Sequence, residues 1–461
     1  MKYLILFAAL SLSACAQQPD SSMPGMDMSK KPAPAKQQTP TPPPADSMPG
    51  MDMSKSTPAD MPGMTMSSRS LIESQLNHSS SGTSIEPNST PASMLMSSHG
   101  GWMLMLHANA FLADTQQTGP RGHAKLYSTN WIMPMAMHTF GRSQITLRTM
   151  LSFEPATISH GYFPQLFQQG ETAKNLPIID GQHPHDFFME LAALYDFRPT
   201  HNTLLSLYLA PIGDPAIGPT AYPHRLAASE NPLAALGHHQ QDSTHIAFNV
   251  ITAGLTYRIA RVELSGFHGA EPTEARWHFQ PSPNGHALDS YSTRLTLSPT
   301  QNLTAQYSFA KIKSPEQLFP AENQTRQTAS LMYNRPITNG NLSTTFIWGH
   351  TATDEDSYLA EALVNFAHKN YIWTRIESAT RSNELSLTPN QPLPPNFAEK
   401  PIGHAQAFSF GYDRDFHIAP HLLAAPGAQY TLYRTPPPLT QIYGPHPSGV
   451  ALFIRFRLAS D

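Results

Sequence analysis

The stretch WMLMLHANAFLA, residues 102–113, alternates between two kinds of side chain. In an extended chain, one face of this stretch would be apolar throughout, with Trp102, Leu104, Leu106, Ala108, Ala110 and Leu112. The opposite face would carry Met103, Met105, His107, Asn109 and Phe111. Residues 142–153 and 450–458 repeat the alternation. Because successive side chains of a strand point to opposite faces, such runs of about ten residues are typical of strands that cross a membrane in a β-barrel.

Short and long connections alternate between these strands. We expect short turns near residues 140–141, 199–200, 259–260, 299–300, 338–341, 368–369 and 418–419. We expect longer loops near 114–123, 154–183, 212–241, 270–287, 313–325, 350–356, 381–403 and 434–446. Outer-membrane barrels have this asymmetry, with short periplasmic turns and long extracellular loops. The sequence therefore predicts an all-β fold, a transmembrane antiparallel up-and-down β-barrel of about 16 strands (12–16) over residues 100–461. A soluble β-sandwich or propeller, the alternative, would not explain the loop asymmetry.

The composition narrows the class of protein further. Charged residues make up 13% of the 461 residues, hydrophobic residues only 40%, and no apolar run reaches the length of a spanning helix, which excludes a helical membrane protein. A formal net charge of -4 gives no reason to expect nucleic acid as a partner. The single cysteine excludes a disulfide within the chain and a four-cysteine zinc site.

The N-terminus reads MKYLILFAALSLSAC, with Lys2, an apolar core and small residues before Cys15. It resembles a bacterial lipoprotein signal, which implies removal of residues 1–14 and lipidation of Cys15. The alternative is an ordinary secretory signal that is cut near Ala14 or Ala16. Under either interpretation the chain leaves the cytoplasm, and Ala16 directly after the cysteine favours the outer membrane of a Gram-negative bacterium.

Residues 15–99 are expected to form a disordered periplasmic arm, because they are rich in Met, Pro and Ser and poor in aliphatic and aromatic residues. Within them SMPGMDMS occurs at 22–29 and again at 47–54, and DMPGMTMS follows at 60–67. The repeats place thioethers at Met23, Met26, Met28, Met48, Met51, Met53, Met61, Met64 and Met66. Thioether sulfur prefers Cu(I) or the similarly soft Ag(I), and it needs no deprotonation to bind. The repeats therefore predict a copper-binding arm; the alternative is a low-complexity tether.

Further candidate metal ligands lie in the barrel and its loops. Met103, Met105 and His107 share the polar face of the first strand, which would face the lumen. Met133, Met135 and Met137 share one face of the next strand, although the pattern does not say which. The loops add His183, His185, His238, His239 and His245. Imidazole suits Cu(II), Zn or Ni, so these histidines could form a site; the alternative is that they stabilise polar loops through hydrogen bonds.

Charged residues also alternate onto the expected inward faces of the strands. They are Arg148, Glu190, Arg261, Glu263, Arg294, Arg375, Glu377, Arg455 and Arg457. Opposite charges across a lumen normally pair, and they set a transverse field that governs the passage of small ions.

The methionine repeats (Met23–Met28, Met48–Met53 and Met61–Met66) together with the barrel resemble the copper-resistance outer membrane proteins of Gram-negative bacteria. Two features depart from that group, because the repeats lack histidines and a lipoprotein signal is not its usual start. The run GQHPHDFFM at 181–189 resembles an uncharacterised group of outer-membrane barrels. The resemblance implies copper sequestration or efflux at the outer membrane, with membrane lipid, metal ions and periplasmic copper proteins as partners.

Two other functions remain open from the sequence. The first is a general porin or solute channel whose arm is only a tether. The second is an outer-membrane enzyme such as a phospholipase or lipid A deacylase, for which Ser243 with His245, or Ser159 with His160, are nearby pairs. No cofactor fingerprint is present, so we expect no organic cofactor and no enzymatic activity.

Overall fold

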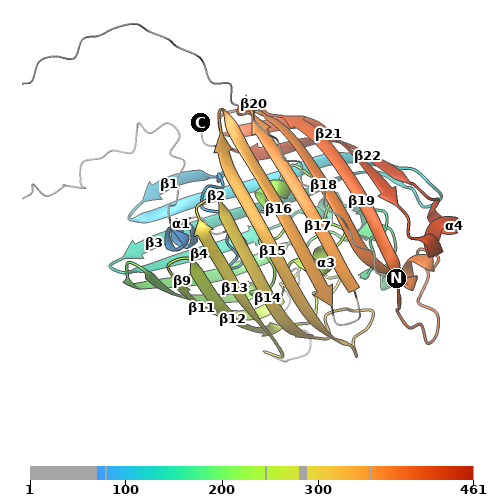
Figure 1. Ribbon diagram of the computed structural model, residues 1–461, viewed down its shortest axis with the longest axis horizontal. Coiled ribbons are helices and arrows are strands. Elements are labelled where there is room, and N and C mark those ends of the chain that lie inside the picture. Colours follow the sequence, from blue (N-terminus) through green and yellow to red (C-terminus); the bar gives the residue numbers. More distant parts are fainter. Residues whose placement is uncertain (1–69, 78–79, 244–246, 280–287, 352–354, 460–461) are drawn as a thin grey trace, which may run out of the picture. The chain divides into compact units, whose positions relative to one another are not determined.

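The computed structural model describes residues 70–77, 80–243, 247–279, 288–351 and 355–459. All of them belong to one compact unit, Asp60–Asp461. Sixteen antiparallel strands follow one another around a closed ring, which is sealed where the first barrel strand pairs with the last (Figure 1). This confirms the predicted fold class and strand number. Among the described residues, no helix is both long and apolar enough to cross a membrane.

The ring consists, in chain order, of β2 (Trp102–Gln117), β3 (Ala124–Phe140), β4 (Ser143–Leu151), β9 (Phe188–Thr200), β10 (Thr203–Gly213), β11 (Ala247–Tyr257), β12 (Ala260–His268), β13 (Ser290–Thr300), β14 (Leu303–Lys313), β15 (Asn323–Ile337), β16 (Gly340–Thr351), β17 (Glu355–Phe366), β18 (Asn370–Ser382), β19 (Pro401–Arg414), β21 (Leu422–Arg434) and β22 (Ser448–Leu458). Two further strands extend it, β1 (Leu95–His99) on β2 and β20 (Phe416–Ala419) on β21.

Short elements lie in the loops and before the first strand. Two small ribbons occur between β4 and β9, namely β5 (Phe163–Pro164) with β8 (Gly181–Gln182), and β6 (Glu171–Ala173) with β7 (Leu176–Ile178). The helices are α1 (Leu71–Asn77), α2 (Glu154–Thr157), η1 (Ser159–Gly161), η2 (Leu226–Ala228), α3 (His238–Gln241), η3 (Asn383–Ser386), η4 (Pro437–Leu439) and α4 (Thr440–Tyr443).

The connections agree with the sequence-based expectation. Short turns join β3 to β4, β9 to β10, β11 to β12, β13 to β14, β15 to β16, β17 to β18, and β19 through β20 to β21. The longer loops alternate with these turns and therefore lie at the opposite end of the ring. The loop expected at 350–356 falls mainly on residues 352–354, which are outside the described residues.

The outer and inner faces of the wall differ as the alternation predicts. Along β10, the side chains of Leu205, Leu207 and Leu209 are exposed, whereas Leu204 and Tyr208, which point to the other face, are buried. Large apolar side chains are exposed in the same alternating way on strands all around the ring. Exposed aromatic residues also stand just before short turns, at Phe140, Phe197, Tyr257 and Phe366. Aromatic residues at the edge of an apolar band are a feature of barrels that sit in lipid.

The described end of the expected arm is ordered, which corrects the predicted boundary at residue 99. Residues 71–77 form α1, and most side chains from 81 to 88 are buried. Gln75 Nε2 donates to Asp196 Oδ1 of the wall (2.9 Å), and Arg294 Nη2 donates to Thr83 Oγ1 (2.8 Å). Gly82 has φ +52°, and a Cβ built on it would lie 2.7 Å from Asp214 Cβ. The sequence prediction is wrong here because these residues obtain partners from distant strands, which no local pattern shows.

Two long loops also bind to the inside of the wall. The first, residues 152–187, follows β4, and the second, of which residues 214–243 are described, follows β10. From the second loop, Arg225 Nε donates to Glu361 Oε2 of β17 (2.8 Å), and the Leu236 amide donates to Glu377 Oε1 of β18 (2.6 Å). A Cβ at Gly349 of β16 would lie 2.2 Å from the Gln240 carbonyl oxygen, so only glycine lets α3 approach the wall this closely.

Most of the inward-facing charges of the wall are buried in ion pairs. The pairs are Arg148–Glu190 (2.6 Å), Arg261–Glu263 (2.9 Å), Arg294–Glu263 (2.9 Å), Arg375–Glu361 (2.7 Å), Arg455–Glu230 (2.6 Å) and Arg457–Glu230 (3.3 Å). Glu377 differs, because its printed hydrogen bond comes from the Leu236 amide and not from an arginine. Most of the pairs join neighbouring strands or a strand and an inward loop, and do not face one another across open space.

Candidate functional site

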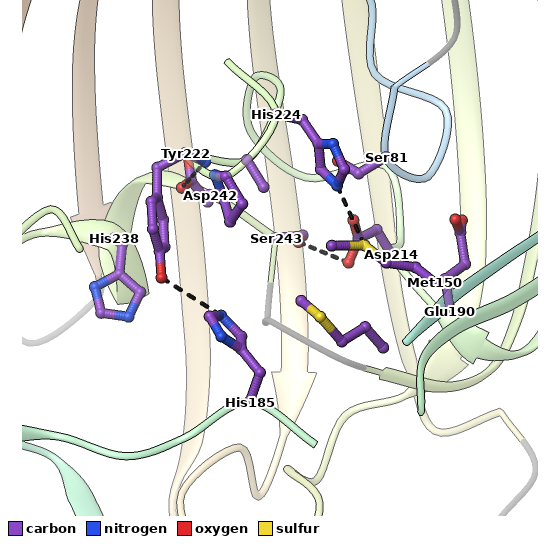
Figure 2. A pocket seen from close by; sticks show the side chains of 13 residues that line it. Ser81, Met150, His185, Glu190, Asp214, Tyr222, His224, His238, Asp242 and Ser243 are labelled. Carbon is purple, nitrogen blue, oxygen red and sulfur yellow. Dashed lines mark hydrogen bonds between the residues drawn. The ribbon is translucent and has the colours of Figure 1, made fainter. Parts of the chain in front are cut away.

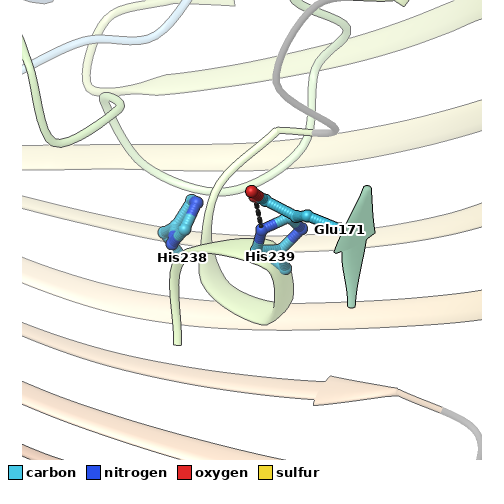
Figure 3. Close-up of side chains that lie close together, drawn as sticks. All are labelled: Glu171, His238 and His239. Carbon is cyan, nitrogen blue, oxygen red and sulfur yellow. Dashed lines mark hydrogen bonds and ion pairs between the residues drawn. The ribbon is translucent and has the colours of Figure 1, made fainter. Parts of the chain in front are cut away.

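A cluster of imidazole and carboxylate groups joins the two inward loops. It consists of Glu171 on β6, His183 just after β8, and His238 and His239 on α3, and we call it the loop cluster. Glu171 Oε1 lies 2.6 Å from His239 Nε2 and 3.2 Å from His183 Nε2. One ligand atom from each of Glu171, His238 and His239 lies within 4.8 Å of the others (Figure 3).

The hydrogen bonds within the loop cluster favour an ionised carboxylate. Glu171 accepts from the His183 amide (2.9 Å) and from Gln182 Nε2 (2.8 Å), in addition to His239. Donors of this kind stabilise the charged form of a carboxyl group. Burial, together with the charge of Arg276, lowers the pKa of His183 to about 3 despite the nearby carboxylate of Glu171. Burial and the neighbouring His239 likewise hold the pKa of His238 well below its ordinary value.

Backbone carbonyls set the tautomers of two rings in the loop cluster. His183 Nδ1 lies 2.7 Å from the Pro184 oxygen, and His238 Nδ1 lies 2.6 Å from the Ala235 oxygen. Because a carbonyl oxygen only accepts, both Nδ1 atoms carry the hydrogen, and in the neutral rings each Nε2 is an acceptor. Histidines that bind metals are commonly oriented by such an Nδ1–H···O=C bond.

His185 belongs to a neighbouring set of contacts. Its Nδ1 donates to Glu154 Oε2 (2.9 Å), and its Nε2 lies 3.4 Å from the Tyr222 hydroxyl oxygen. Burial is the largest single influence and opposes the charged imidazolium, but the charge and hydrogen bond of Glu154 together with the charges of Asp186 and Glu171 outweigh it, so the pKa of His185 is raised. His185 therefore holds the first inward loop to the second through an ion pair and a tyrosine.

A second cluster, which we call the methionine cluster, is apolar and lies inside the barrel. It contains Met94, Met133, Met135, Met150 and Met189, with Trp131, Ile212 and Phe248 among them, and the partly buried Met105 packs against it. This settles the question that the sequence left open, because Met133, Met135 and Met137 are all nearly fully buried and face inward. Barrel interiors are usually polar, so thioethers gathered from six separate positions are an unusual lining.

A histidine from the second inward loop reaches the methionine cluster. His224 Nε2 lies 3.2 Å from Met150 Sδ, and its Nδ1 has no hydrogen-bond partner within the part of the chain that the structure describes. A cavity of about 50 Å³ lies beside them and is also lined by Met189, His185 and His238 (Figure 2). Burial and the nearby His107 hold the pKa of His224 well below its ordinary value, so the ring is neutral at physiological pH.

The structure brings together most, but not all, of the barrel residues that the sequence singled out. His183, His238 and His239 meet in the loop cluster, and α3 lets the adjacent His238 and His239 rings lie 4.2 Å apart on one side. His107 stacks edge-on against Trp131 (4.6 Å) and lies near the His224 ring (6.0 Å). Met105 packs against the methionine cluster, whereas Met103 lies opposite Met137 at its margin.

Several predicted residues lie outside the described part of the chain. These are Cys15, His245, and the arm methionines Met23, Met26, Met28, Met48, Met51, Met53, Met61, Met64 and Met66. The copper-binding arm and the lipid anchor thus stay predictions. Of the serine–histidine pairs, Ser243 Oγ donates to Asp214 Oδ1 (3.2 Å). His160 is an exposed residue with φ 61°.

The sequence does not indicate the two carboxylates that contact these histidines, namely Glu171 in the loop cluster and Glu154 beside His185. Glu171 and Glu154 lie in the expected long loop 154–183 with no ligand spacing to the histidines, so no local signal in the sequence identifies them. No spacing in the sequence joins Met150 of β4 to His224 of the second inward loop. The inward fold of the loops is what makes them neighbours.

No protein-family model matches this chain, and no curated relative matches it. Among solved structures it is similar to Salmonella typhi OmpF in complex with daunomycin (TM-score 0.47, 8% identity, 78% of this chain and 100% of that one). It is also similar to Pseudomonas putida OprB (TM-score 0.46, 9% identity, 78% and 94%). A third similar structure is the anion-selective porin from Comamonas acidovorans (TM-score 0.43, 10% identity, 77% and 100%). Similarities of this size carry no function over to this chain, and its barrel rests on its own strand pairing.

Proposed function

We propose that this chain is an outer-membrane channel of the porin type whose lumen is narrowed by its own loops and N-terminal segment. Its support is the closed ring of sixteen strands with an apolar outer face and short turns at one end. Barrels of this size leave an aqueous passage when nothing fills them. Here two loops and residues 80–94 bind to the inner wall, so the passage would admit only small solutes and ions.

Leu264→Arg tests the membrane location. Leu264 lies in the middle of β12 and is 62% exposed, so in a bilayer the arginine would face lipid near the midplane. We expect a loss of about 2–4 kcal/mol in the free energy of unfolding in lipid vesicles, measured by denaturant titration. Leu126→Arg is the matched control, since Leu126 is 64% exposed but lies at the loop end of β3, where about 0–1 kcal/mol is expected. Equal and small effects at both positions would contradict a membrane-spanning wall.

We further propose that a soft metal ion, Cu(I), is the cargo of this channel. The observation that carries the proposal is the contact between His224 Nε2 and Met150 Sδ beside a cavity that is also lined by Met189. Thioethers with an imidazole form a ligand set suited to Cu(I), and a cavity of about 50 Å³ exceeds the room that a water molecule needs. The arm methionines would capture the ion before it enters, a step that depends on residues outside the described structure.

Copper binding by the barrel itself is the decisive measurement. We expect the full-length protein to bind several Cu(I) ions in competition with a chromophoric chelator, and a variant lacking residues 16–69 to retain one. In that shortened variant, Met150→Leu with His224→Phe should weaken Cu(I) binding by about 100-fold, or about 2.7 kcal/mol. Met332→Leu is the matched control, because Met332 is equally buried (2% exposed) but lies outside the methionine cluster. Unchanged Cu(I) affinity in the double variant would contradict a Cu(I) site at Met150 and His224.

A general solute channel is the second candidate function. The buried arginine–glutamate pairs along the wall favour it, because paired charges of this kind tune the passage of small solutes without a dedicated metal site. In liposomes, sugar permeation that does not depend on Cu(I), together with a lack of Cu(I) binding, would identify this function. The fold is the same in both cases, so only the transported solute separates the two.

A further inference from the structure

We propose that the loop cluster binds a divalent ion of borderline softness, with Zn²⁺ as the type case, and that this ion fastens the two inward loops to each other. The ligands would be Glu171 from the first inward loop and His238 and His239 from the second, with His183, 3.2 Å from Glu171, as a neighbouring fourth. The site is separate from the methionine cluster and does not rest on copper being the cargo.

The spacing of the ligand atoms suits a tetrahedral site. Ligands about 2.0–2.1 Å from a zinc ion in tetrahedral geometry are about 3.3 Å from one another. Glu171 Oε1 lies 3.2 Å from His183 Nε2, and its distance from His239 Nε2 is 2.6 Å. The ligand atoms of Glu171, His238 and His239 fit within 4.8 Å, so shifts of about an ångström would bring all of them to an ion.

The hydrogen bonds of His183 supply an independent argument. Its Nδ1 lies 2.7 Å from the Pro184 carbonyl oxygen, which fixes the orientation of the ring. Its Nε2 is thereby directed at Glu171 Oε1, 3.2 Å away. This is the orientation that a metal ion shared by the two side chains requires.

Room and an additional carboxyl group are present beside the loop cluster. A cavity of about 20 Å³ is lined by Glu171, His183 and Glu271, which is more space than one water molecule needs. Glu271 comes from the loop after β12, and its Oε1 lies 4.0 Å from His239 Nδ1. Nitrogen and oxygen ligands without sulfur favour zinc, nickel or Cu(II) over Cu(I), which sets this site apart from the methionine cluster.

Zn²⁺ titration of the purified full-length protein in detergent micelles, in competition with a chromophoric chelator, tests the proposal. We expect one tightly bound Zn²⁺ per chain. Glu171→Gln, which keeps the shape of the side chain, and the double variant His183→Ala with His239→Ala should each weaken Zn²⁺ binding by at least 100-fold. His417→Ala, at an exposed position on β20, is the matched control and should bind like the wild type. Circular dichroism of each variant confirms that the barrel has folded.

A second measurement keeps the proposal testable if the double variant fails to fold. X-ray absorption of the wild-type zinc complex should show nitrogen and oxygen neighbours only. A sulfur neighbour, unchanged Zn²⁺ affinity in Glu171→Gln, or no tight Zn²⁺ binding by the wild type would each overturn the proposal. Cu(I) affinity measured on the same variants should not change, so a failure here is distinguishable from a failure of the copper proposal.

Discussion

Glu361→Gln is expected to lower the free energy of unfolding by about 3–5 kcal/mol, because it removes one partner from a buried charge network. Glu361 of β17 accepts from Arg375 Nε of β18 (2.7 Å) and from Arg225 Nε of the second inward loop (2.8 Å). All three side chains are at most 2% exposed. The uncharged glutamine would leave both buried guanidinium groups without this carboxylate, although Arg225 would keep its ion pair with Asp242 (3.4 Å).

Denaturant titration of the variant in lipid vesicles measures this loss. Asp356→Asn is the matched control, because the ion pair of Asp356 with His350 is partly exposed (36% for Asp356), and such pairs contribute about 0–1 kcal/mol. A loss below 1 kcal/mol for Glu361→Gln would mean that water reaches this part of the lumen. In that case the second inward loop would not be fixed to the wall by Glu361.

Removal of residues 70–94 is expected to raise the single-channel conductance several-fold. These residues bind the inner wall through Gln75, Gly82 and Thr83, and without them that part of the lumen fills with water. Arg148 and Arg294 would keep their carboxylate partners, so the wall should remain folded. Planar-bilayer recordings of the shortened and full-length proteins provide the comparison.

Two further variants separate this effect from a general defect in folding. Gly82→Val places a side chain where a Cβ would meet Asp214 at 2.7 Å, so it should displace the N-terminal segment and also raise the conductance. Gly100→Val imposes the same unfavourable positive φ, but a Cβ there meets nothing within 4 Å, so the conductance should stay at the wild-type value. A conductance that is unchanged by both the deletion and Gly82→Val would show that this segment does not limit the passage.

The wall of the barrel could be predicted from sequence because a strand repeats every two residues. Leu205, Leu207 and Leu209 face outward, and the residues between them face inward, which needs no knowledge of any distant residue. The seven short turns were located for the same reason, since they interrupt a regular pattern. The order of the strands then follows from chain order in an up-and-down barrel.

The contents of the barrel could not be predicted in this way. The segment after residue 80 has no period, because its order depends on contacts with Arg148 and Arg294, far along the chain. Glu171 and His239 are likewise separated by a whole pair of strands, and they meet only because both loops turn inward. The sequence pattern therefore indicates the histidines as candidate metal ligands. It indicates neither the carboxylate of Glu171, which joins them, nor the site that they form together.

The seam between β2 and β22 has a consequence for the order of assembly. Its paired residues, from Asn109 with Arg457 to Gln117 with Gly449, come from opposite ends of the barrel sequence. Contacts between such distant residues form late and slowly, because the entropy of loop closure must be overcome first. The N-terminal segment and the two loops lie inside the finished ring, so they must enter before the seam closes or thread through an open end. The last step of folding would thus enclose the contents of the barrel, and a misplaced segment would be trapped kinetically.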